Sequence, residues 1–511
     1  MKVLLVKPPR FLWPYLSEDD NILLPQALPC LASVLRENDI EVKIVDCVPL
    51  KIGWNSLRNI LAKERPHVVG ISESETMWSH EGIKASQLAK ELDPDVTVVA
   101  GGNHFSNLPE ETLKTGSVDF VVKGEGEYTF LDLVKEAEKT NPDFKKVKGI
   151  YFKKNGKIMR THFRPLINDL DELPLPAYDL LPMDEYGKSR YLFHPGGATI
   201  HHSRGCSFNC DFCSCWIQMG QCKLVNGRIK TLPRWRTKSV ERTMEEIELL
   251  YYKYKKRGLV FTDDNWNFNP KWNEEFADAV VARGLNLNWF AFMRADHIIR
   301  DSRMGILKKL VDAGLSHVSI GVERHIDSDL KSLNKTYTRD IIKTAFRILK
   351  ENHPSVFRQG TFIIGLKNET RKSVFGLLKY VKDLDLDYPS FSPLTPVPGT
   401  VVWKKAKKEG RIEVKDFKLY DWFTPIMSSE RLTREEIANF IFLLNKKHFS
   451  FNKVIRGLLS THKYKRKMYM WFMIVSLRIL KENLKDISGL PSILDRKEML
   501  TNLVRPKWYY D

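Results

Sequence analysis

The sequence of 511 residues contains only seven cysteines, and its N-terminus has no secretory pattern. A small fold stapled by disulfides needs a much higher density of cysteine, so no disulfide framework is expected. Free thiols are typical of a reducing compartment, and we therefore expect a cytoplasmic protein.

Long apolar runs are also lacking, because none reaches the roughly 18 residues that a membrane-spanning helix requires. Hydrophobic residues make up 43% of the chain, the composition of an ordinary globular protein. A chain of this length is expected to form about two to four domains with sizeable cores.

Positive charge is abundant and unevenly distributed. The net charge is +18, and residues 401–511 carry 24 Lys and Arg against 12 Asp and Glu. Such a surplus is typical of a surface that meets nucleic acid, anionic lipid or an acidic protein, although solvated lysine faces explain it equally well. No RNA-reading motif accompanies the basic tail, so nucleic acid is the least favoured of these partners.

Three of the cysteines lie together in the segment CSFNCDFC, where Cys206, Cys210 and Cys213 have the spacing C-x3-C-x2-C. Iron–sulfur clusters are normally held by four cysteines, so a loop that supplies three leaves one iron open to another ligand. Structural zinc sites usually have two pairs of ligands, and no second pair follows here. His201 and His202 lie close by and keep a Cys/His zinc site as an alternative.

This segment resembles the cluster motif of the radical S-adenosylmethionine (SAM) family, including the aromatic Phe212 before the last cysteine. The resemblance implies a [4Fe-4S] cluster on the three cysteines, which are thus the expected catalytic and metal-binding residues. The cluster would bind SAM and cleave it to a 5′-deoxyadenosyl radical. A one-electron reductant such as flavodoxin or ferredoxin is then an implied partner. Cys215 and Cys222 fall outside the motif, and we expect spectator thiols.

Strands and helices alternate through the first 150 residues, which predicts a doubly wound parallel sheet. Ligands of such sheets bind outside the carboxyl ends of the strands, where glycines let backbone N–H groups approach a phosphate or a flat ligand. No GxGxxG follows the first strand, which disfavours a dinucleotide. The expected cofactor-binding residues at these strand ends are Gly70, Ser72, Gly101, Gly102, Gly124, Glu125 and Gly126.

The blocks PHVVGISES, VVAGGNHFSNLPEETL and VDFVVKGEGEYTFLDLV are similar to the cobalamin-binding domain of class B radical SAM enzymes. Many such domains carry D-x-H-x-x-G, whose histidine binds cobalt, but Val48 occupies that position here. The resemblance therefore implies cobalamin without a histidine ligand. His104 is nearby, although a loop histidine more often forms hydrogen bonds. A vestigial sheet that binds no cofactor is the alternative.

After residue 194 six further strand–helix units match the partial (β/α)6 barrel of radical SAM enzymes. Reactive groups of such a barrel lie at the C-terminal ends of its strands. The predicted domains are a Rossmann-like cobalamin-binding domain (1–145), a linker (146–194), the radical SAM barrel (195–405) and a basic helical C-terminal domain (406–511). The fold class is accordingly α/β.

Several strand ends of the predicted barrel resemble the SAM-binding elements of the family. Asp263 and Asp264 match the element that meets the SAM amino group, for which a carboxylate is the expected partner. Arg294 matches the element that faces the SAM carboxylate. Glu323 resembles the acid that reaches the ribose, although Arg324 follows it where a small residue is usual.

Two later segments complete this resemblance. Gly365 belongs to a stretch similar to the G-x-I-x-G-x-x-E element that lies against adenine, with Glu369 as its acidic end. The sequence TPVPGT at residues 395–400 resembles the turn that closes the barrel.

The C-terminal region is expected to be helical, beginning with an amphipathic helix at Thr433–His448. The apolar segment Met468–Leu480 is preceded by Lys465, Arg466 and Lys467. We favour a core helix that closes the substrate chamber. A helix on a membrane surface is the alternative, which would place the protein at the periphery of a membrane.

These features predict a cobalamin-dependent radical SAM C-methyltransferase that moves a methyl group from methylcobalamin to an unactivated carbon. The segments RGCSFNCDFCSCW and YDWFTP are similar to the anaerobic magnesium-protoporphyrin monomethyl ester cyclase-like subfamily. Oxidative cyclisation of a tetrapyrrole or lipid without methyl transfer is therefore one alternative, and a non-catalytic cofactor-carrying binding or assembly protein is a second. A protein side chain, a lipid and a tetrapyrrole remain open as substrates, and the basic, apolar tail slightly favours a lipid or a protein.

Overall fold

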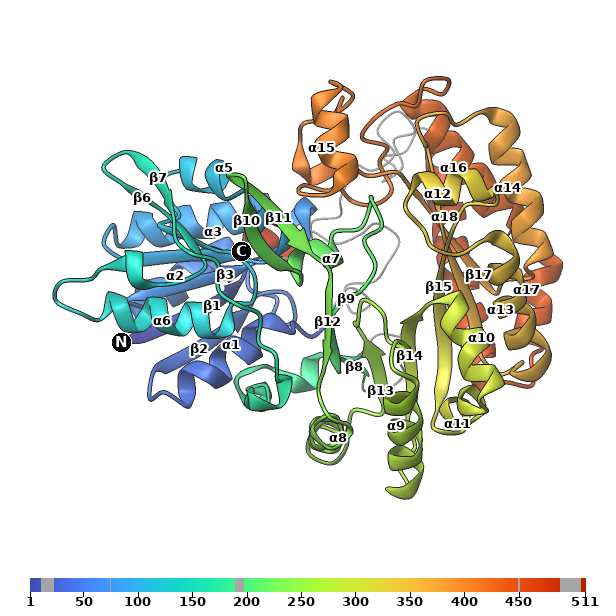
Figure 1. Ribbon diagram of the computed structural model, residues 1–511, viewed down its shortest axis with the longest axis horizontal. Helices are drawn as coiled ribbons and strands as arrows, with labels where there is room; N and C mark the ends of the chain where they lie inside the picture. The colour runs from blue at the N-terminus through green and yellow to red at the C-terminus, as the bar shows by residue number, and fades with distance from the viewer. Residues whose placement is uncertain (11–22, 74, 189–196, 449–450, 488–506) are drawn as a thin grey trace.

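The computed structural model of the protein describes residues 1–10, 23–73, 75–188, 197–448, 451–487 and 507–511. Two β-sheets form its framework (Figure 1). The N-terminal sheet lies on the left in Figure 1 and the central sheet on the right, with strands of residues 203–237 between them. Helices cover the outer surfaces of both sheets.

The N-terminal sheet has the strand order β2-β1-β3-β4-β5-β6-β7. Its first five strands are parallel, and the inner ones are largely apolar because helices bury both faces: α1 and α6 pack on one, α2 and α3 on the other. The edge strand β2 (EVKIVD) also carries charged side chains. The strand order reverses between β1 and β3, where doubly wound sheets bind ligands. The bounds are β1 Lys2–Lys7, α1 Ala27–Arg36, β2 Glu41–Asp46, α2 Trp54–Glu64, β3 Val68–Ser72, α3 Ser79–Leu92, β4 Thr97–Gly101, α4 Asn103–Asn107, α5 Pro109–Lys114, β5 Phe120–Val122 and α6 Glu127–Ala137.

Residues 150–160, predicted to lie in the linker, extend this sheet instead. β6 (Ile150–Lys154) pairs antiparallel with β5, and β7 (Lys157–Arg160) pairs antiparallel with β6. The connecting Asn155 and Gly156 both have positive φ, as a two-residue hairpin turn requires. The N-terminal Rossmann-like fold is confirmed, but its sheet is mixed rather than wholly parallel.

The central sheet contains the six predicted parallel strands, in the order β17-β16-β15-β14-β13-β8. The predicted partial barrel is therefore confirmed. Large buried side chains, Phe261, Trp266 and Trp289 among them, pack its helices against the sheet. The bounds are β8 Gly197–Ile200, α8 Val240–Glu248, β13 Gly258–Phe261, α9 Pro270–Ala282, β14 Asn288–Met293, α10 Ala295–Arg303, α11 Ile306–Asp312, β15 Leu315–Glu323, α12 Asp327–Ser332, α13 Arg339–Asn352, β16 Phe357–Ile364, α14 Arg371–Asp383 and β17 Tyr388–Pro393.

A small insertion that the alternation of strands and helices did not predict separates β8 from α8. β9 pairs antiparallel with β12, and β10 pairs with β11 in a hairpin. Cys206 is the last residue of β9 and pairs with Arg234, so the cysteine loop starts from a two-stranded support. The bounds are β9 Ser203–Cys206, α7 Cys215–Gln218, β10 Gln221–Val225, β11 Arg228–Leu232 and β12 Arg234–Thr237.

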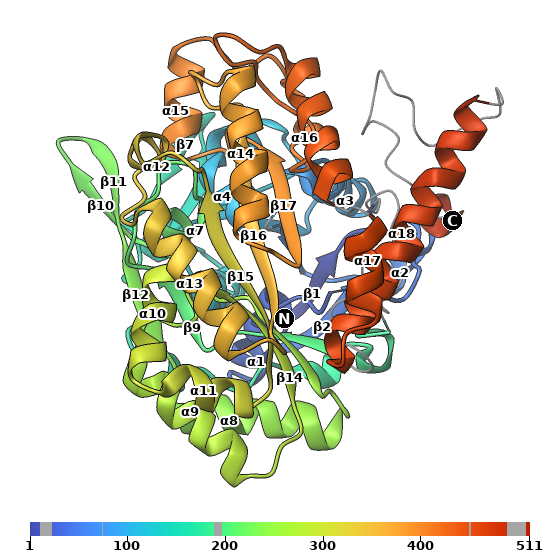
Figure 2. The same cartoon turned by 90° about the vertical axis from the view of Figure 1, so that its right-hand side faces the viewer.

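The C-terminal helices α17 and α18 lie side by side (Figure 2) and pack where the barrel strands begin. Met468, Tyr469 and Phe472 of α18 surround Phe357, the first residue of β16. The prediction that this apolar segment closes the substrate chamber is therefore wrong, because the chamber belongs at the opposite strand ends. The helices are α15 Val401–Lys408, α16 Arg434–His448, α17 Phe451–Leu458, α18 Lys463–Ile487 and the short 3-10 helix η9 Lys507–Tyr510.

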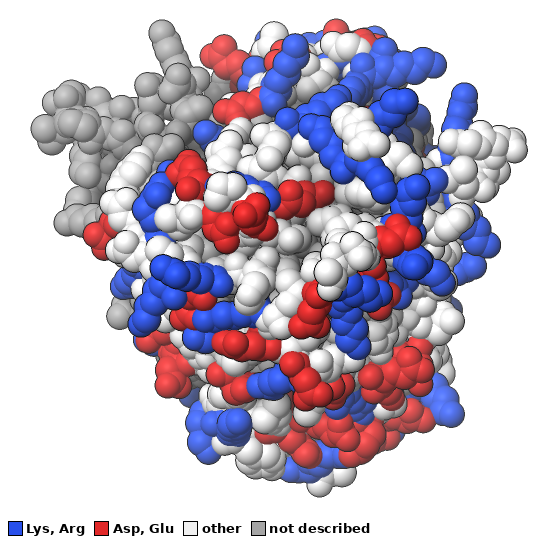
Figure 3. Space-filling view, turned by 90° about the vertical axis from the view of Figure 1, so that its left-hand side faces the viewer, with Lys and Arg blue, Asp and Glu red and all other residues white. Residues whose placement is uncertain are grey.

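Searching the described residues for a helix both long enough and apolar enough to cross a membrane gives none. The face shown in Figure 3 carries cations and carboxylates side by side, with acidic side chains gathered toward its lower part. The surplus of positive charge is therefore not spread evenly over the molecule.

The packing of α18 can be tested with Phe472→Ala. Phe472 is 5% exposed and stacks on Phe357 and Tyr388. We expect the variant to lose about 3–5 kcal/mol of unfolding free energy, because it leaves a cavity in this cluster. Urea denaturation measures the loss. The neighbouring Met473→Ala, at a position 36% exposed, is the control and should lose less than about 0.5 kcal/mol. Equal losses would contradict this packing.

Candidate functional site

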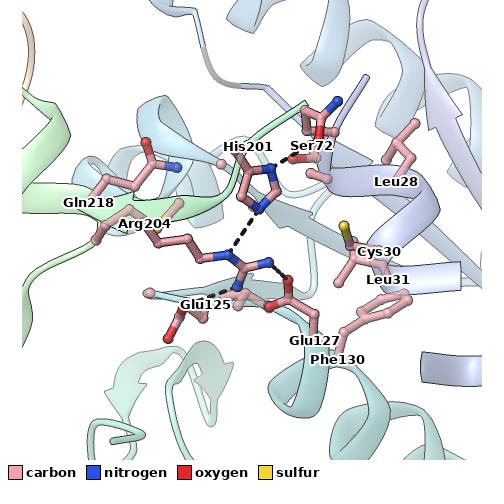
Figure 4. Close-up of a pocket in the computed structure, with 18 of the residues that line it drawn as sticks. Leu28, Cys30, Leu31, Ser72, Glu125, Glu127, Phe130, His201, Arg204 and Gln218 are labelled. Atoms are coloured by element: carbon pink, nitrogen blue, oxygen red, sulfur yellow. Dashed lines mark hydrogen bonds and ion pairs between the residues drawn. The ribbon is translucent and has the colours of Figure 1, made fainter. Parts of the chain in front are cut away.

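A pocket of about 250 Å³ lies between the carboxyl ends of β3, β4 and β5 and the start of the barrel (Figure 4). The barrel side of its wall includes His201, Arg204, Thr262 and Asp264. The sheet side contains all seven residues predicted from the strand ends: Gly70, Ser72, Gly101, Gly102, Gly124, Glu125 and Gly126. The two domains thus build one site together.

The glycines of this wall serve two different purposes. A Cβ at Gly101 would meet nothing closer than Val122 at 3.8 Å, and one at Gly124 would meet nothing within 4 Å. Both positions therefore leave open space for a flat ligand, which fits the expected corrin ring. Gly102 differs, because its φ is +88° and a Cβ would lie 2.4 Å from the Glu73 carbonyl oxygen. Gly102 is required by the turn between β4 and α4.

A buried charge network joins the domains below this pocket. Arg204 donates from Nη1 to Glu125 Oε1 at 2.9 Å and from Nη2 to Glu127 Oε1 at 2.7 Å (Figure 4). Arg236 donates to Glu125 Oε2 at 2.8 Å and to the Ile167 carbonyl oxygen at 2.7 Å. Burial lowers the pKa of Arg204, but the charges of Glu127 and Glu125 outweigh it and raise this pKa. The guanidinium is thus always charged.

Glu125 has a structural role in addition to the predicted cofactor contact, which stays a prediction. Two arginines and the backbone N–H of Ile167, at 2.8 Å from Oε2, bind its carboxylate. It positions the glycine loop against the barrel. Arg204 and Arg236 were not predicted, because nothing in the sequence pairs them with acids 79 and 111 residues away.

His201 also lines the pocket, although the sequence suggests it only as a ligand of the alternative zinc site. Its Nδ1 lies 3.0 Å from Gln26 Oε1, and its Nε2 accepts from Arg204 Nε at 3.4 Å. Burial and the nearby cations Lys238 and Arg204 lower its pKa well below the usual value, so the ring is neutral. His202 is turned away and stacks on Trp272 at 3.7 Å. The two histidines therefore do not act as a pair.

Neither Val48, at the position of the usual cobalt-binding histidine, nor His104 lines the pocket. Val48 is buried in the core with Leu24 and Tyr186. His104 packs against Phe417 at 4.9 Å, and burial lowers its pKa to about 3. Of the described residues that line the pocket, His201 alone has an imidazole.

The cysteine loop is tied to the barrel on two sides. The Asp211 N–H donates to the Leu333 carbonyl oxygen at 3.1 Å, and the Val402 N–H donates to the Asp211 carbonyl oxygen at 3.1 Å. Phe212, the aromatic of the motif, packs with Leu333 and Leu366. These contacts hold the loop over the C-terminal ends of the barrel strands.

The three thiols of the loop are free, and their pKa values reflect burial. Burial raises the pKa of Cys206 to about 12 and also raises that of Cys210. A hydrogen bond from Cys215 lowers the pKa of Cys213. Within the described part of the chain no three His, Cys, Asp or Glu side chains already surround a metal position. The fit to a cluster therefore rests on the donor set and its place in the fold.

The two predicted acids after β13 face different partners. Asp263 Oδ1 accepts from the Ser203 N–H at 2.6 Å and its hydroxyl at 2.5 Å, which fixes the corner between β8 and β9. Its Oδ2 is buried without a hydrogen-bond partner among the described residues, and burial raises its pKa to about 7. Asp264 lines the pocket and accepts from Cys215 and the Gly205 N–H. Cys215 thus links this acid to Cys213, beyond the predicted spectator role.

Arg294 and Glu323 both lie beside the cysteine loop. The Arg294 guanidinium stands 3.4 Å above the ring of Phe208, between Cys206 and Cys210, and donates to Asp296 at 2.8 Å. Glu323 has a positive φ of +59° and forms an ion pair with Lys335 at 3.0 Å. Their roles toward SAM stay predictions. Lys335 was not predicted from any sequence pattern, and its ion pair with Glu323 places it among these residues beside the cysteine loop.

The element predicted to lie against adenine is held by an unexpected arginine. Arg324 is fully buried and donates to Glu369 at 2.7 Å and to Asp329 at 3.0 Å. Glu369 also accepts from the Gly365 N–H at 3.2 Å. Gly365 has a φ of +90°, and a Cβ there would lie 3.1 Å from Ile437. Glu369 therefore stabilises this turn.

The interdomain network can be tested with Arg204→Met. We expect a loss of about 3–5 kcal/mol of unfolding free energy, because Glu127 would stay buried without its partner. Arg36→Met is the control, since the Arg36–Asp179 pair is about half exposed and contributes at most about 1 kcal/mol. Urea denaturation followed by tryptophan fluorescence measures both. If Arg204→Met loses no more unfolding free energy than Arg36→Met, the result would contradict a stabilising role for this network.

Comparisons with known proteins agree with this architecture. The B12 binding domain model matches residues 13–134, and the Radical SAM superfamily model matches residues 200–381. "Uncharacterized methyltransferase PH0819" of Pyrococcus horikoshii is 33% identical over 460 residues, 88% of this chain and 92% of that protein. The anaerobic magnesium-protoporphyrin IX monomethyl ester cyclase of Rubrivivax gelatinosus is 28% identical over 84% of this chain and 74% of that protein.

Among solved structures, the radical SAM methyltransferase TsrM from Kitasatospora setae, with cobalamin and a [4Fe-4S] cluster bound, has a similar fold. The TM-score is 0.68 with 16% identity, over 93% of this chain and 99% of that one. The predicted cofactors, a [4Fe-4S] cluster, SAM and cobalamin, agree with both family models. The chain therefore belongs to the cobalamin-dependent radical SAM enzymes, which join a B12-binding domain to a radical SAM domain.

Proposed function

We propose that the protein is a C-methyltransferase that methylates an unactivated carbon. The observation that supports it best is the shared pocket, where open glycine positions of the N-terminal sheet face Asp264 beside the cysteine loop. Methyl transfer of this kind needs both cofactors next to one substrate carbon, and a pocket built by both domains meets that need. The methyltransferase name of the 33% identical relative points the same way.

When bound, the cluster and SAM supply a 5′-deoxyadenosyl radical, and methylcobalamin supplies the methyl group. The chain's own residues position and enclose these groups. Gly101 and Gly124 leave the space for a flat ring, and Arg204 holds both walls of the pocket together. Burial of this network excludes water from one side of the site, which protects a reactive radical.

Oxidative cyclisation remains the second candidate, supported by the resemblance of YDWFTP to the cyclase-like subfamily. Within this segment Trp422 has a positive φ of +68° and donates from Nε1 to Glu75 Oε2 at 3.1 Å. The preceding Phe417 packs on His104. The segment thus spans from the C-terminal region to the N-terminal domain, where it can shape access to a substrate.

A protein side chain, a lipid and a tetrapyrrole stay open as substrate classes, and flavodoxin or ferredoxin as reductant. The apolar tail gave lipid and protein substrates a slight advantage in the sequence. That advantage depended on α18 bordering the chamber, and α18 packs at the other end of the barrel. A binding or assembly role without catalysis is the third hypothesis.

Anaerobic reconstitution with iron, sulfide and cobalamin tests the proposal directly. We expect the wild type to cleave SAM to 5′-deoxyadenosine and to add one CH2 to a substrate in cell extracts, as read by mass spectrometry. Cys213→Ala should abolish both, because the cluster loses one of its three ligands. Cys222→Ala is the matched control, since its thiol lies outside the cluster motif, in the β10–β11 hairpin, 3.6 Å from Thr231 Oγ1.

Each rival gives a different product. Loss of hydrogen without the added CH2 would favour a cyclase and overturn methyl transfer. A fully loaded wild type that produces no 5′-deoxyadenosine would favour a binding or assembly protein. Full SAM cleavage by Cys213→Ala would contradict the assignment of the cluster cysteines.

A further inference from the structure

A second cavity, of about 610 Å³, lies at the end of the central sheet where β16 and β17 begin. It is remote from the reactive strand ends and shares no lining residue with the pocket between the domains. Its walls come from β16, from the helices α13, α14, α16, α17 and α18, and from the segments that connect them. Seven of its lining residues are Lys or Arg and two are Asp.

Both carboxylates of the cavity are already engaged by cations. Asp387 accepts from Lys465 at 3.0 Å and from the Tyr469 hydroxyl at 3.2 Å, and Arg358 Nε lies 3.5 Å away. Asp385 pairs with Lys350 at 3.0 Å. Both carboxylates among the described lining residues are therefore paired already, and the other cations of the cavity have no acidic partner in this lining.

Three exposed cations that line the cavity have no such partner among the described residues. They are Lys382 of α14, Lys447 of α16 and Arg456 of α17, and none forms an ion pair or side-chain hydrogen bond with another described residue. Three separate helices bring these like charges to one cavity. Like charges held together repel one another, so their convergence indicates an anionic ligand.

We propose that this cavity binds a phosphate group through Lys382, Lys447 and Arg456. The arginine guanidinium and the lysine ammonium are donors that bind phosphate oxygens, and three cations from different helices suit a tetrahedral anion. The site goes beyond the proposed methyl transfer and does not depend on it. The phosphate can belong to a lipid headgroup or to a soluble metabolite.

The helix that supplies Arg456 also provides a way to separate these two sources. Leu459, just after α17, is 76% exposed, and Ile455 one turn earlier is 37% exposed. A bilayer that presents the phosphate would bury these apolar side chains, whereas a soluble phosphate would not contact them.

The 511-residue chain is tested with two probes, glycerol 1-phosphate in calorimetry and vesicles of phosphatidylglycerol and phosphatidylcholine in sedimentation. We expect wild type to bind at least one of them, and Lys382→Ala/Lys447→Ala/Arg456→Ala to bind at least about tenfold more weakly. The control Lys153→Ala/Lys154→Ala/Lys157→Ala removes the same charge from the exposed β6–β7 hairpin and should bind like wild type. Arg456→Ala alone repeats the test if the triple variant fails to fold.

The two sources give different patterns. If the phosphate belongs to a lipid, Leu459→Ser should weaken vesicle binding, because it removes an apolar side chain without adding charge. If the phosphate is soluble, Leu459→Ser should leave glycerol 1-phosphate binding unchanged. A wild-type protein that binds neither of the two probes would overturn the proposal. Equal binding by the cavity variant and the hairpin control would also overturn it. Neither result depends on SAM cleavage, so this test is independent of the proposed reaction.

Discussion

The buried ion pairs between Arg204, Glu125 and Glu127 are the constraint on which the site depends. A charge taken out of water is stable only with close partners, so these residues force the glycine loop of one domain against the first strand of the insertion in the other. Arg236 adds a second cation on Glu125 from the neighbouring strand β12. The pocket for a flat cofactor lies directly along this junction. A loss of pairing would separate the two walls.

The same principle organises the cysteine loop. Buried groups with opposite charges or hydrogen-bond partners surround it: Lys335 with Glu323, Arg294 with Asp296, and Asp264 with Cys215. One partner in each contact, Glu323, Arg294 or Asp264, lies at or just after the end of a separate barrel strand. These strand ends converge at one edge of the sheet because the strands are parallel. The barrel thereby brings together the residues that the resemblance assigns to SAM.

The sequence predicted what depends on local pattern. The alternation of strands and helices predicted the parallel strands of both sheets, and the strand ends predicted seven residues that line one pocket. The sequence did not predict the ion pairs of Arg204 and Arg236, because their acidic partners are distant in the chain. The sequence around a buried arginine also does not distinguish it from an arginine on the surface. The apolar face of α18 was recognised, but periodicity shows only that a helix is buried on one side, not against which end of the barrel. The hairpin at Asn155–Gly156 was missed although its turn residues are a strong signal.

If one pocket between the two domains holds the cobalamin next to the cluster, a large side chain in that pocket must expel it. Gly101→Leu provides such a side chain, because φ at Gly101 allows one and its Cβ would face open space at the pocket wall. After anaerobic reconstitution, cobalamin is quantified by its absorbance and iron by colorimetry, each per protein chain. We expect the variant to lose cobalamin and to keep iron at the wild-type level. Cobalamin retained at the wild-type level would contradict this placement, since the corrin ring would then bind elsewhere.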